Sequence, residues 1–379
     1  MDSDRPWFVL AGGGTGGHLY PGLAVIEVIR SLYPRAEVTV FGTSRVIDRK
    51  LVAARGYELV PQDVKVLTLK PWRWPGFLGA WRRSRRVARD RFQSRRPAVI
   101  LGLGGYAAGP PVVAAAKLRI PSAIFNPDAI PGRANRWLGS RVDRVFVQWQ
   151  ATGDRFPRAR DVRCTGCPVR SDFTRVDRAK ACAALRLDAD KPVLLITGAS
   201  QGAHSLNATV SDLCEHRCRD ADMELLKRWQ VVHLTGRADL ELCRKTYKAC
   251  GITARTYTFI EEMHLCMAAA DLIISRAGAS TLAEITVMRR PAILMPYPYD
   301  RKRHQLANAR VLVDENAAEL VEDSTNPVDN AVRLREVLLP LLRSEQHRHR
   351  LARAAASMGR LNAAENVAHN LLEMAGLPT

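Results

Sequence analysis

The side chains with the clearest chemical potential near the start of the chain are Thr15 and His18, which lie in and directly after a glycine-rich stretch. Five of the six residues from 12 to 17 are glycine, and an apolar run precedes them. This pattern predicts a strand, a tight loop and a helix that continues to about residue 29. Glycines let the backbone approach a phosphate closely, and the first turn of a helix offers unpaired N–H groups. We therefore expect this stretch to bind an anion, with Thr15 and His18 able to act beside it.

The same loop also fits a dinucleotide-binding pattern through Gly12, Gly14 and Gly17. That pattern normally has an acidic residue about 20 positions further on, at the end of the second strand, where it holds a ribose. The second predicted strand, residues 37–41, is followed by Gly-Thr-Ser instead. A nicotinamide or flavin cofactor is therefore disfavoured, and no cofactor is predicted.

Two later stretches repeat the arrangement of a strand followed by a glycine turn. Residues 198–203 form a second glycine loop after the predicted strand 191–197. After the strand 271–274, Gly278 is expected to form a turn, Ser280 and Thr281 to begin a helix, and Glu284 to lie one turn further along on the same side. A pyrophosphate at the helix start and a ribose diol on Glu284 would fit this spacing. Taken alone, the segment is more typical of a capped helix with an exposed glutamate.

The elements that must position these residues are predicted to be parallel strands. Apolar, β-branched runs alternate with helical segments at residues 8–10, 38–41, 98–103, 122–125, 144–147, 191–197, 231–234, 271–274 and 292–296. This alternation is typical of an α/β protein. Ligands of such sheets bind beyond the carboxyl ends of the strands. The segments that follow strands there are residues 12–18, 104–106, 126–128 and the polar run 300–308.

Length and charge limit the possible organisation and partners. The chain has 379 residues, which suits two domains with separate cores. Lysine and arginine number 57 against 38 acidic residues, a formal net charge of +19. Such an excess favours a membrane surface, a nucleic acid or a phosphorylated substrate, and charge alone does not choose among them.

One stretch concentrates the positive charge among aromatic residues. From Lys70 to Arg96 there are ten basic residues and one acid, Asp90. The stretch is interleaved with Trp72, Trp74, Phe77, Leu78 and Trp81. It could be a solvated helix face with a few aromatics tucked into the core. We prefer a membrane-surface element, because tryptophan and phenylalanine seat in the headgroup layer while arginine attracts anionic lipid. No recognised nucleic-acid motif accompanies these cations, so no nucleic acid is predicted as a partner.

Two further features are interpreted as structural. The CxxC pair Cys164 and Cys167 has no second pair or histidine at zinc-ligand spacing, so the cysteines are expected to be reduced structural thiols. The uncharged run 97–116 is long enough to span a membrane but contains several glycines and prolines. A strand, a glycine loop and a helix fit it better, and we expect a soluble, cytoplasmic protein.

With these residues in view, the chain resembles the MurG family of N-acetylglucosaminyltransferases, which convert lipid I to lipid II in peptidoglycan synthesis. The resemblance covers nearly the whole length. Its motifs are residues 13–18, 104–106, 166–170, 198–203, 276–284 and 304–308.

The resemblance implies an α/β fold with two Rossmann-like domains of the glycosyltransferase B architecture and a cleft between them. The implied domains are an acceptor and membrane-associating domain at residues 1–165, a UDP-sugar domain at 166–345, and a helical segment at 346–379 that packs back on the first. It also implies a peripheral protein at the cytoplasmic face of the inner membrane. The implied partners are UDP-N-acetylglucosamine, lipid I and the anionic membrane surface, with other cell-wall synthesis proteins as further candidates.

The resemblance also implies roles for individual residues. Donor contacts would come from Thr15, Gly16, Gly17, Asp128, Arg170, Ser200, Ile260, Ala279, Ser280, Thr281, Leu282, Ala283, Glu284, His304, Gln305 and Asn308. The acceptor side would be Gly13, Gly14, Gly104, Gly105 and Tyr106. The membrane patch of the family falls in the region of Trp72, Trp74, Phe77, Leu78 and Trp81.

The chain departs from the family pattern at residues 125–128, which are Phe-Asn-Pro-Asp instead of His-Glu-Gln-Asn. The usual donor-contacting asparagine is therefore Asp128 here, and the neighbouring histidine is absent. His18 is the first candidate for the general base because the ordinary pKa of histidine is near neutral, and Asp128 is the second. No Asp-x-Asp pair stands beside these loops, so no metal is expected in the catalytic step.

The residues also bear on two rival functions. A related glycosyltransferase with a diacylglycerol, sterol or other lipid acceptor would keep the donor half unchanged, but Gly104, Gly105 and Tyr106 favour lipid I. The presence of His18, Glu284 and Gln305 together argues against a catalytically idle lipid-binding protein on the same scaffold.

Overall fold

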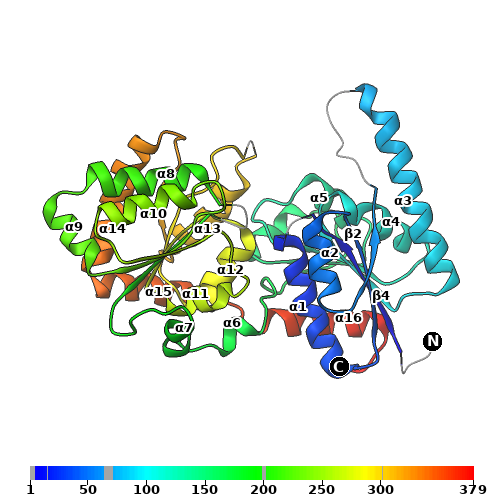
Figure 1. Cartoon of the computed structure of the whole chain (residues 1–379). Coiled ribbons are helices and arrows are strands. Elements are labelled where there is room, and N and C mark those ends of the chain that lie inside the picture. The colour runs from blue at the N-terminus through cyan, green and yellow to red at the C-terminus, as the bar shows by residue number, and fades with distance from the viewer. Residues whose placement is uncertain (1–4, 15, 64–70, 199–201, 301) are drawn as a thin grey trace. The chain divides into compact units, whose positions relative to one another are not determined.

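The chain folds into two α/β units, which Figure 1 shows with their labelled elements. The computed structural model describes residues 5–14, 16–63, 71–198, 202–300 and 302–379. The first unit comprises Met1–Arg170 with Arg360–Thr379, and the second comprises Ser171–Gly359. Each unit is built on its own parallel sheet, which confirms the predicted fold class of two Rossmann-like domains.

The first sheet has seven parallel strands in the order β3-β2-β1-β4-β5-β6-β7. Their bounds are β1 Trp7–Gly12, β2 Glu37–Gly42, β3 Glu58–Pro61, β4 Val99–Gly104, β5 Ser122–Asn126, β6 Arg144–Val147 and β7 Val162–Cys164. The strand order reverses between β1 and β4, which is the position where open α/β sheets bind ligands. The loops that follow these two strands are therefore the natural site of this unit.

The helices of the first unit lie between its strands in the sequence, in the alternation typical of an α/β protein. They are α1 Gly16–Leu32, α2 Val46–Ala53, α3 Trp74–Ser94, α4 Gly109–Lys117 and α5 Arg133–Gly139, with short turns η1 Pro71–Arg73, η2 Tyr106–Ala108 and η3 Gln150–Arg155. The last helix of the chain, α16 Ala363–Ala375, packs against α1 and completes this unit.

The second sheet has six parallel strands in the order β10-β9-β8-β11-β12-β13. Their bounds are β8 Val193–Thr197, β9 Gln230–Leu234, β10 Ala254–Tyr257, β11 Leu272–Ser275, β12 Ala292–Leu294 and β13 Glu319–Leu320. The surrounding helices are α6 Asp172–Arg175, α7 Arg178–Ala184, α8 His204–Asp212, which η4 Leu213–Arg217 continues, α9 Asp220–Lys227, α10 Leu240–Ala249, α11 Met263–Ala269, α12 Ala279–Val287, α13 His304–Val313, α14 Pro327–Arg343 and α15 Glu345–Met358.

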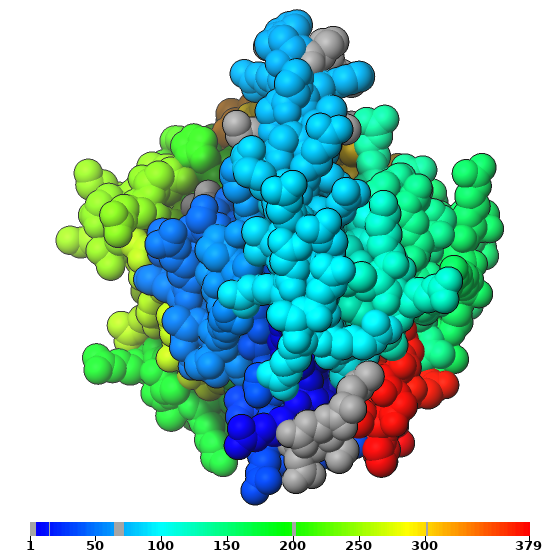
Figure 2. Space-filling view, turned by 90° about the vertical axis from the view of Figure 1, so that its right-hand side faces the viewer, coloured from blue at the N-terminus to red at the C-terminus, as the bar shows by residue number. Residues whose placement is uncertain are grey.

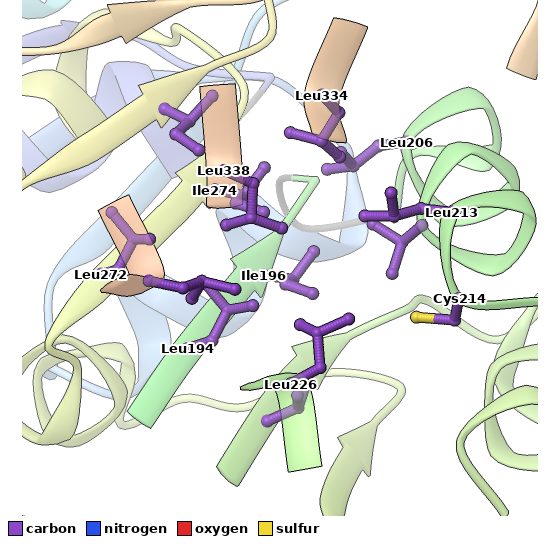
Figure 3. Packing of buried hydrophobic residues seen from close by; sticks show 14 of the residues in the cluster. Leu194, Ile196, Leu206, Leu213, Cys214, Leu226, Leu272, Ile274, Leu334 and Leu338 are labelled. Carbon is purple, nitrogen blue, oxygen red and sulfur yellow. The ribbon is translucent and has the colours of Figure 1, made fainter. Parts of the chain in front are cut away.

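The core of the second unit is an apolar layer between the sheet and its helices. Figure 3 shows Ile196 and Ile274 from the central strands beside Leu206 of α8 and Leu338 of α14. All four are almost completely buried. Burial of this kind stabilises a fold by about 1.5–3 kcal/mol per large aliphatic side chain.

The segment that returns to the first unit begins later than the predicted residue 346. Helix α15 packs on α12 and α14 and belongs to the second unit, so the chain returns to the first unit only at residue 360. The helical pattern continues across this point, because α14, α15 and α16 follow one another with short breaks at Ser344 and Gly359. Periodicity alone therefore does not mark the boundary.

The eight cysteines all lie among the described residues and form no disulfide with one another. Burial raises the pKa of Cys266 to about 12 and that of Cys243 to about 11, which keeps both as neutral thiols at neutral pH. Among the described residues, no helix has the length and apolar character needed to cross a bilayer.

Candidate active site

The glycine loop after β1 is shaped by a buried carboxylate that sequence analysis did not single out. Asp48, on α2, accepts hydrogen bonds from the backbone N–H of Gly14 at 2.9 Å and from the N–H and hydroxyl of Thr43 at 2.8 and 2.7 Å. Gly13 has φ +154° and Gly14 has φ +92°. A Cβ atom on Gly13 would overlap the Asp48 carboxylate, so only glycine fits there.

This arrangement corrects one part of the expected anion site. Because Gly14 N–H is already bonded to Asp48, that amide is not available to a phosphate. Arg45 donates to the carbonyl of Gly14 at 2.8 Å and adds a cation at the same loop. Asp48 lies 34 residues from Gly14, and an acidic residue inside a helix gives no sequence signal of such a contact.

The loops after β1 and β4 adjoin and bring the predicted acceptor residues together. A Cβ atom on Gly12 would lie 2.9 Å from the carbonyl oxygen of Gly104, and one on Gly105 would lie 3.7 Å from that of Gly13. Tyr106 follows directly and is 44% exposed. The acceptor candidates of the first unit thus surround one point at the carboxyl edge of its sheet.

His18 lies at that same point, in the first turn of α1. A Cβ atom on Gly104 would be 3.6 Å from Cδ2 of His18. Burial lowers the pKa of His18 below its ordinary value of 6.5, while the negative charges of Asp128 and Asp48 act in the opposite direction. His18 is therefore a neutral imidazole at pH 7, the form in which it can accept a proton.

The position of Asp128 is fixed by two buried asparagines. Asn126, at the end of β5, donates to the backbone carbonyl of Asp128 at 2.7 Å. Asn135, on α5, donates to the side-chain oxygen of Asn126 at 3.1 Å. The negative charge of Asp128 acts to raise the pKa of His18, so the two candidate bases lie within electrostatic range of each other.

Arg170 is also held beside this edge. Its guanidinium carbon lies 4.6 Å from the ring centroid of Tyr20, which is on α1 two residues after His18. Stacking on an aromatic ring orients a guanidinium without neutralising it. Thr15 and Ser200, two of the predicted donor contacts, lie outside the described residues.

In the second unit, one face of α12 carries the predicted polar residues. Ser280, Thr281 and Glu284 are partly exposed on the same side, as their spacing predicted. Three other predicted contacts, Ala279, Leu282 and Ala283, have buried side chains, so only their backbone could meet a ligand.

The start of α12 is open. Gly278 precedes the helix with an ordinary φ of −67°, which any residue can adopt. The glycine therefore serves to leave space at the helix start, and no unusual backbone conformation requires it. A Cβ atom there would have Thr281 Oγ1, at 3.8 Å, as its nearest neighbour. No described side chain caps the helix, which leaves its first-turn amides in the arrangement that binds anions.

Arg276, two residues before Gly278, fastens the loops around this helix start. Its guanidinium donates to the carbonyl of Met295 at 2.9 Å and to the Ser205 hydroxyl at 2.6 Å, and it forms an ion pair with Asp323 at 2.8 Å. The side chains of Arg276 and Asp323 are 4% and 0% exposed. Sequence analysis assigned Arg276 no role, although an arginine directly after a buried, largely apolar strand is unusual enough to be a signal.

The start of α13 contributes the remaining predicted residues. The side-chain oxygen of Gln305 accepts from the backbone N–H of Tyr297 at 3.0 Å, and the backbone N–H of Gln305 donates to the Asp300 carboxylate at 3.1 Å. Asn308 is buried and donates to the carbonyl of Ala277 at 3.3 Å, which ties α13 to the loop before α12. His304 and Ile260 are partly exposed.

The predicted membrane segment divides into outward and inward parts. Trp72, Trp74 and Leu78 are 72%, 48% and 46% exposed, whereas the ring of Trp81 lies against Gly109 and 5.9 Å from the ring of Trp137. Phe77 is partly buried and lies 5.8 Å from Trp81. Figure 2 shows α3 as a long ridge on this face of the first unit.

Two family models match the chain. The glycosyltransferase family 28 N-terminal domain matches residues 8–147, and the glycosyltransferase family 28 C-terminal domain matches residues 193–369. Among the described residues, no group of three or more histidine, cysteine, aspartate or glutamate side chains could hold a metal ion.

Curated relatives and solved structures agree with these matches. A UDP-N-acetylglucosamine–N-acetylmuramyl-(pentapeptide) pyrophosphoryl-undecaprenol N-acetylglucosamine transferase of Anaeromyxobacter dehalogenans is 36% identical over 97% of this chain and 92% of its own. The protein of the same name from Sorangium cellulosum is 38% identical, with 98% and 89% covered. The crystal structure of Acinetobacter baumannii MurG matches with a TM-score of 0.72 at 25% identity, over 97% of this chain and 99% of that one.

Proposed function

We propose that this chain, which belongs to glycosyltransferase family 28, transfers N-acetylglucosamine from UDP-N-acetylglucosamine to the C4 hydroxyl of lipid I and so produces lipid II. The names of the near-full-length relatives support this proposal. The observation that carries it is the pairing of two features: a neutral His18 beside Asp128 in one unit, and the open start of α12 with Glu284 in the other.

The second unit would bind the donor. The amides at the start of α12 would receive the pyrophosphate, and Glu284 would accept hydrogen bonds from the ribose diol. Gln305 and His304, on α13, and Ile260 would complete the nucleotide contacts, together with Arg170. Arg276 would act only by holding the loops in place, because it is buried and already bonded.

The first unit would activate the acceptor. His18 would take the proton of the C4 hydroxyl as its oxygen forms the new bond to the anomeric carbon. The bond from that carbon to the UDP oxygen breaks, and UDP leaves with the electron pair. Attack from the face opposite the leaving group inverts the anomeric configuration. The helix start at Ser280 and the Arg170 guanidinium would stabilise the charge that develops on UDP.

A direct test is incubation with radiolabelled UDP-sugars and either a lipid I analogue or diacylglycerol. Transfer of N-acetylglucosamine to the lipid I analogue is the expected result. Transfer to diacylglycerol alone would replace the acceptor assignment while leaving the donor half intact. No transfer to either acceptor, with UDP binding retained, would contradict the proposed reaction.

The first unit would also hold the protein at the cytoplasmic face of the membrane. Trp72, Trp74 and Leu78 point outward and would seat in the interface, while the arginines of α3 attract anionic headgroups. Replacing these three residues with serine should abolish most vesicle binding but leave activity on a short-chain, soluble acceptor. The matched control is serine at Val328 and Val332, two exposed positions on α14. Undiminished vesicle binding by the first variant would overturn this assignment.

A further inference from the structure

A cavity on the first unit is surrounded by arginines. It has a volume of 640 Å³ and lies between α5 and the segment that begins at the end of η3. Its charged and aromatic lining consists of Arg133, Arg136, Trp137, Arg141, Arg155 and Arg158. No aspartate or glutamate lines it among the described residues. The volume is in the range of sites for small ligands.

Most of this positive charge has no partner within the structure. The side chains of Arg133, Arg136, Arg155 and Arg158 are exposed, and none makes a hydrogen bond or ion pair with another described residue. Arg141 differs, because it donates to the carbonyl of Trp137 at 2.6 Å and lies 4.1 Å from the centre of its ring. The cavity therefore has one fixed cation and four uncommitted ones.

Arginines on and beside the neighbouring strands β6 and β7 of the same unit are paired with carboxylates. Arg144 forms an ion pair with Asp161 at 2.7 Å, and Arg160 forms one with Asp143 at 3.0 Å. Arg163 also contacts Asp161, at 3.1 Å. Carboxylates thus neutralise the arginines along β6 and β7, but none is placed around the cavity. Like charges that converge without a counter-ion repel each other, and a bound anion would remove that repulsion.

The chemistry of the lining indicates which anion fits. Guanidinium groups donate paired hydrogen bonds that match the oxygens of phosphate, and several of them can share one phosphate group. We propose that this cavity is a binding site for a phosphate-bearing group, separate from the donor contacts on the second unit. The group could be the headgroup of a phospholipid or a free phosphate compound, because both present the same oxygens.

The surroundings favour the lipid headgroup as the source. Trp137 lies edge-on to Trp81 at 5.9 Å, and Trp81 is on α3, which carries the exposed Trp74 and Leu78. A headgroup in the cavity would therefore belong to a lipid of the same surface on which α3 is proposed to rest. This lipid assignment depends on the proposed membrane association, whereas phosphate binding in the cavity does not.

The test compares two double variants that each remove two positive charges. Arg136→Ala with Arg158→Ala removes cations from the cavity. Arg350→Ala with Arg353→Ala removes two exposed arginines of α15, which make no hydrogen bond or ion pair with described residues. Each protein is titrated with inorganic pyrophosphate by calorimetry and sedimented with phosphatidylcholine vesicles that contain or lack phosphatidylglycerol. Unchanged thermal unfolding would establish that both variants fold.

The cavity variant should lose at least about tenfold in affinity where the control variant loses little. Loss confined to phosphatidylglycerol vesicles identifies a lipid headgroup, and loss confined to pyrophosphate identifies a soluble ligand. Equal behaviour of the two variants in both measurements would overturn the proposal. Sugar transfer to a soluble acceptor should be unchanged in the cavity variant, so failure of the cavity site and failure of the proposed reaction give different results.

Discussion

The carboxyl edges of the two sheets are organised by buried groups of opposite charge. In the first unit, the carboxylate of Asp48 accepts hydrogen bonds from the N–H groups of Gly14 and Thr43. In the second unit, the guanidinium of Arg276 donates to the carbonyls of Met295 and Pro296 and pairs with Asp323. Both groups hold their loops in place. Asp48 binds backbone N–H groups, whereas Arg276 binds backbone carbonyls.

This difference indicates which sheet edge is better suited to bind an anion and which to present reactive side chains. An edge whose amides are bonded to a carboxylate is less able to bind an anion, and the first unit accordingly presents side chains, His18 and Asp128, instead. An edge whose carbonyls are bonded to a guanidinium keeps amides for a ligand, and the second unit presents the uncapped start of α12. This division supports the proposed assignment of acceptor chemistry to the first unit and of donor binding to the second.

The largest expected effect is loss of the Arg276 anchor. Arg276→Met should destabilise the second unit by about 3–5 kcal/mol, because it leaves the Asp323 carboxylate buried without its cation. Chemical denaturation measures this loss, and Arg276→Lys, which retains a charge, should lose less. If the methionine variant were as stable as the lysine variant, the contrast between the two edges would rest on Asp48 alone.

The next effect concerns the side chains of the first edge. His18→Ala should lower turnover by about a hundredfold or more, the usual scale for loss of a general base, with little change in donor affinity. Steady-state kinetics separate the two quantities. Unchanged turnover would transfer the role of base to Asp128, which Asp128→Ala would then reveal.

Glu284 tests the donor assignment of the second edge. Glu284→Ala should weaken UDP binding by about a hundredfold, since a charged hydrogen bond contributes about 1.5–3 kcal/mol and a ribose diol would lose two. Calorimetry with UDP gives the affinity, and Thr281→Ser is a mild control on the same face. Equal affinity of mutant and parent would make Glu284 a surface residue without a ligand.

The smallest effect is a displacement of the pH profile. The acid limb of the rate should lie below pH 6.5, because burial lowers the pKa of His18 and protonation removes its ability to act as a base. The Asp128 charge raises that pKa, so Asp128→Asn should lower it further and move the acid limb to lower pH. A limb that stays in place would mean that the two side chains do not act together.

Sequence analysis predicted the central strands well and the edge strands poorly. The runs at β1, β2, β4, β5 and β8 are mostly apolar, and all their residues except Glu37 are buried, which gives a strong signal. The strands β3, β7, β10 and β13 were missed. They are two to four residues long, lie at or near a sheet edge, and include polar residues such as Arg163 and Glu319. Their pairing depends on a neighbouring strand that is distant in sequence.

The candidate site was predictable where chemistry and local spacing coincide. The shared face of Ser280, Thr281 and Glu284 follows from helical geometry and was found. The supports were missed, because Asp48 meets Gly14 across 34 residues and Arg276 meets Asp323 across 47. Only the fold makes these residues neighbours. From a single sequence, the residues that can react are easier to identify than the distant residues that hold them in place.

The return of α16 to the first unit has a consequence for synthesis of the chain on the ribosome. Helix α16 buries Val367, Leu371 and Leu372 in the first unit, and Glu373 binds Arg144 there at 2.9 Å. Residues 171–359 are translated between the two segments of that unit, residues 1–170 and 360–379. The amino-terminal part must therefore wait, with the apolar side of α1 uncovered, until the whole intervening unit has emerged. The period before α16 emerges is consequently the stage of synthesis at which the first unit most needs protection from aggregation.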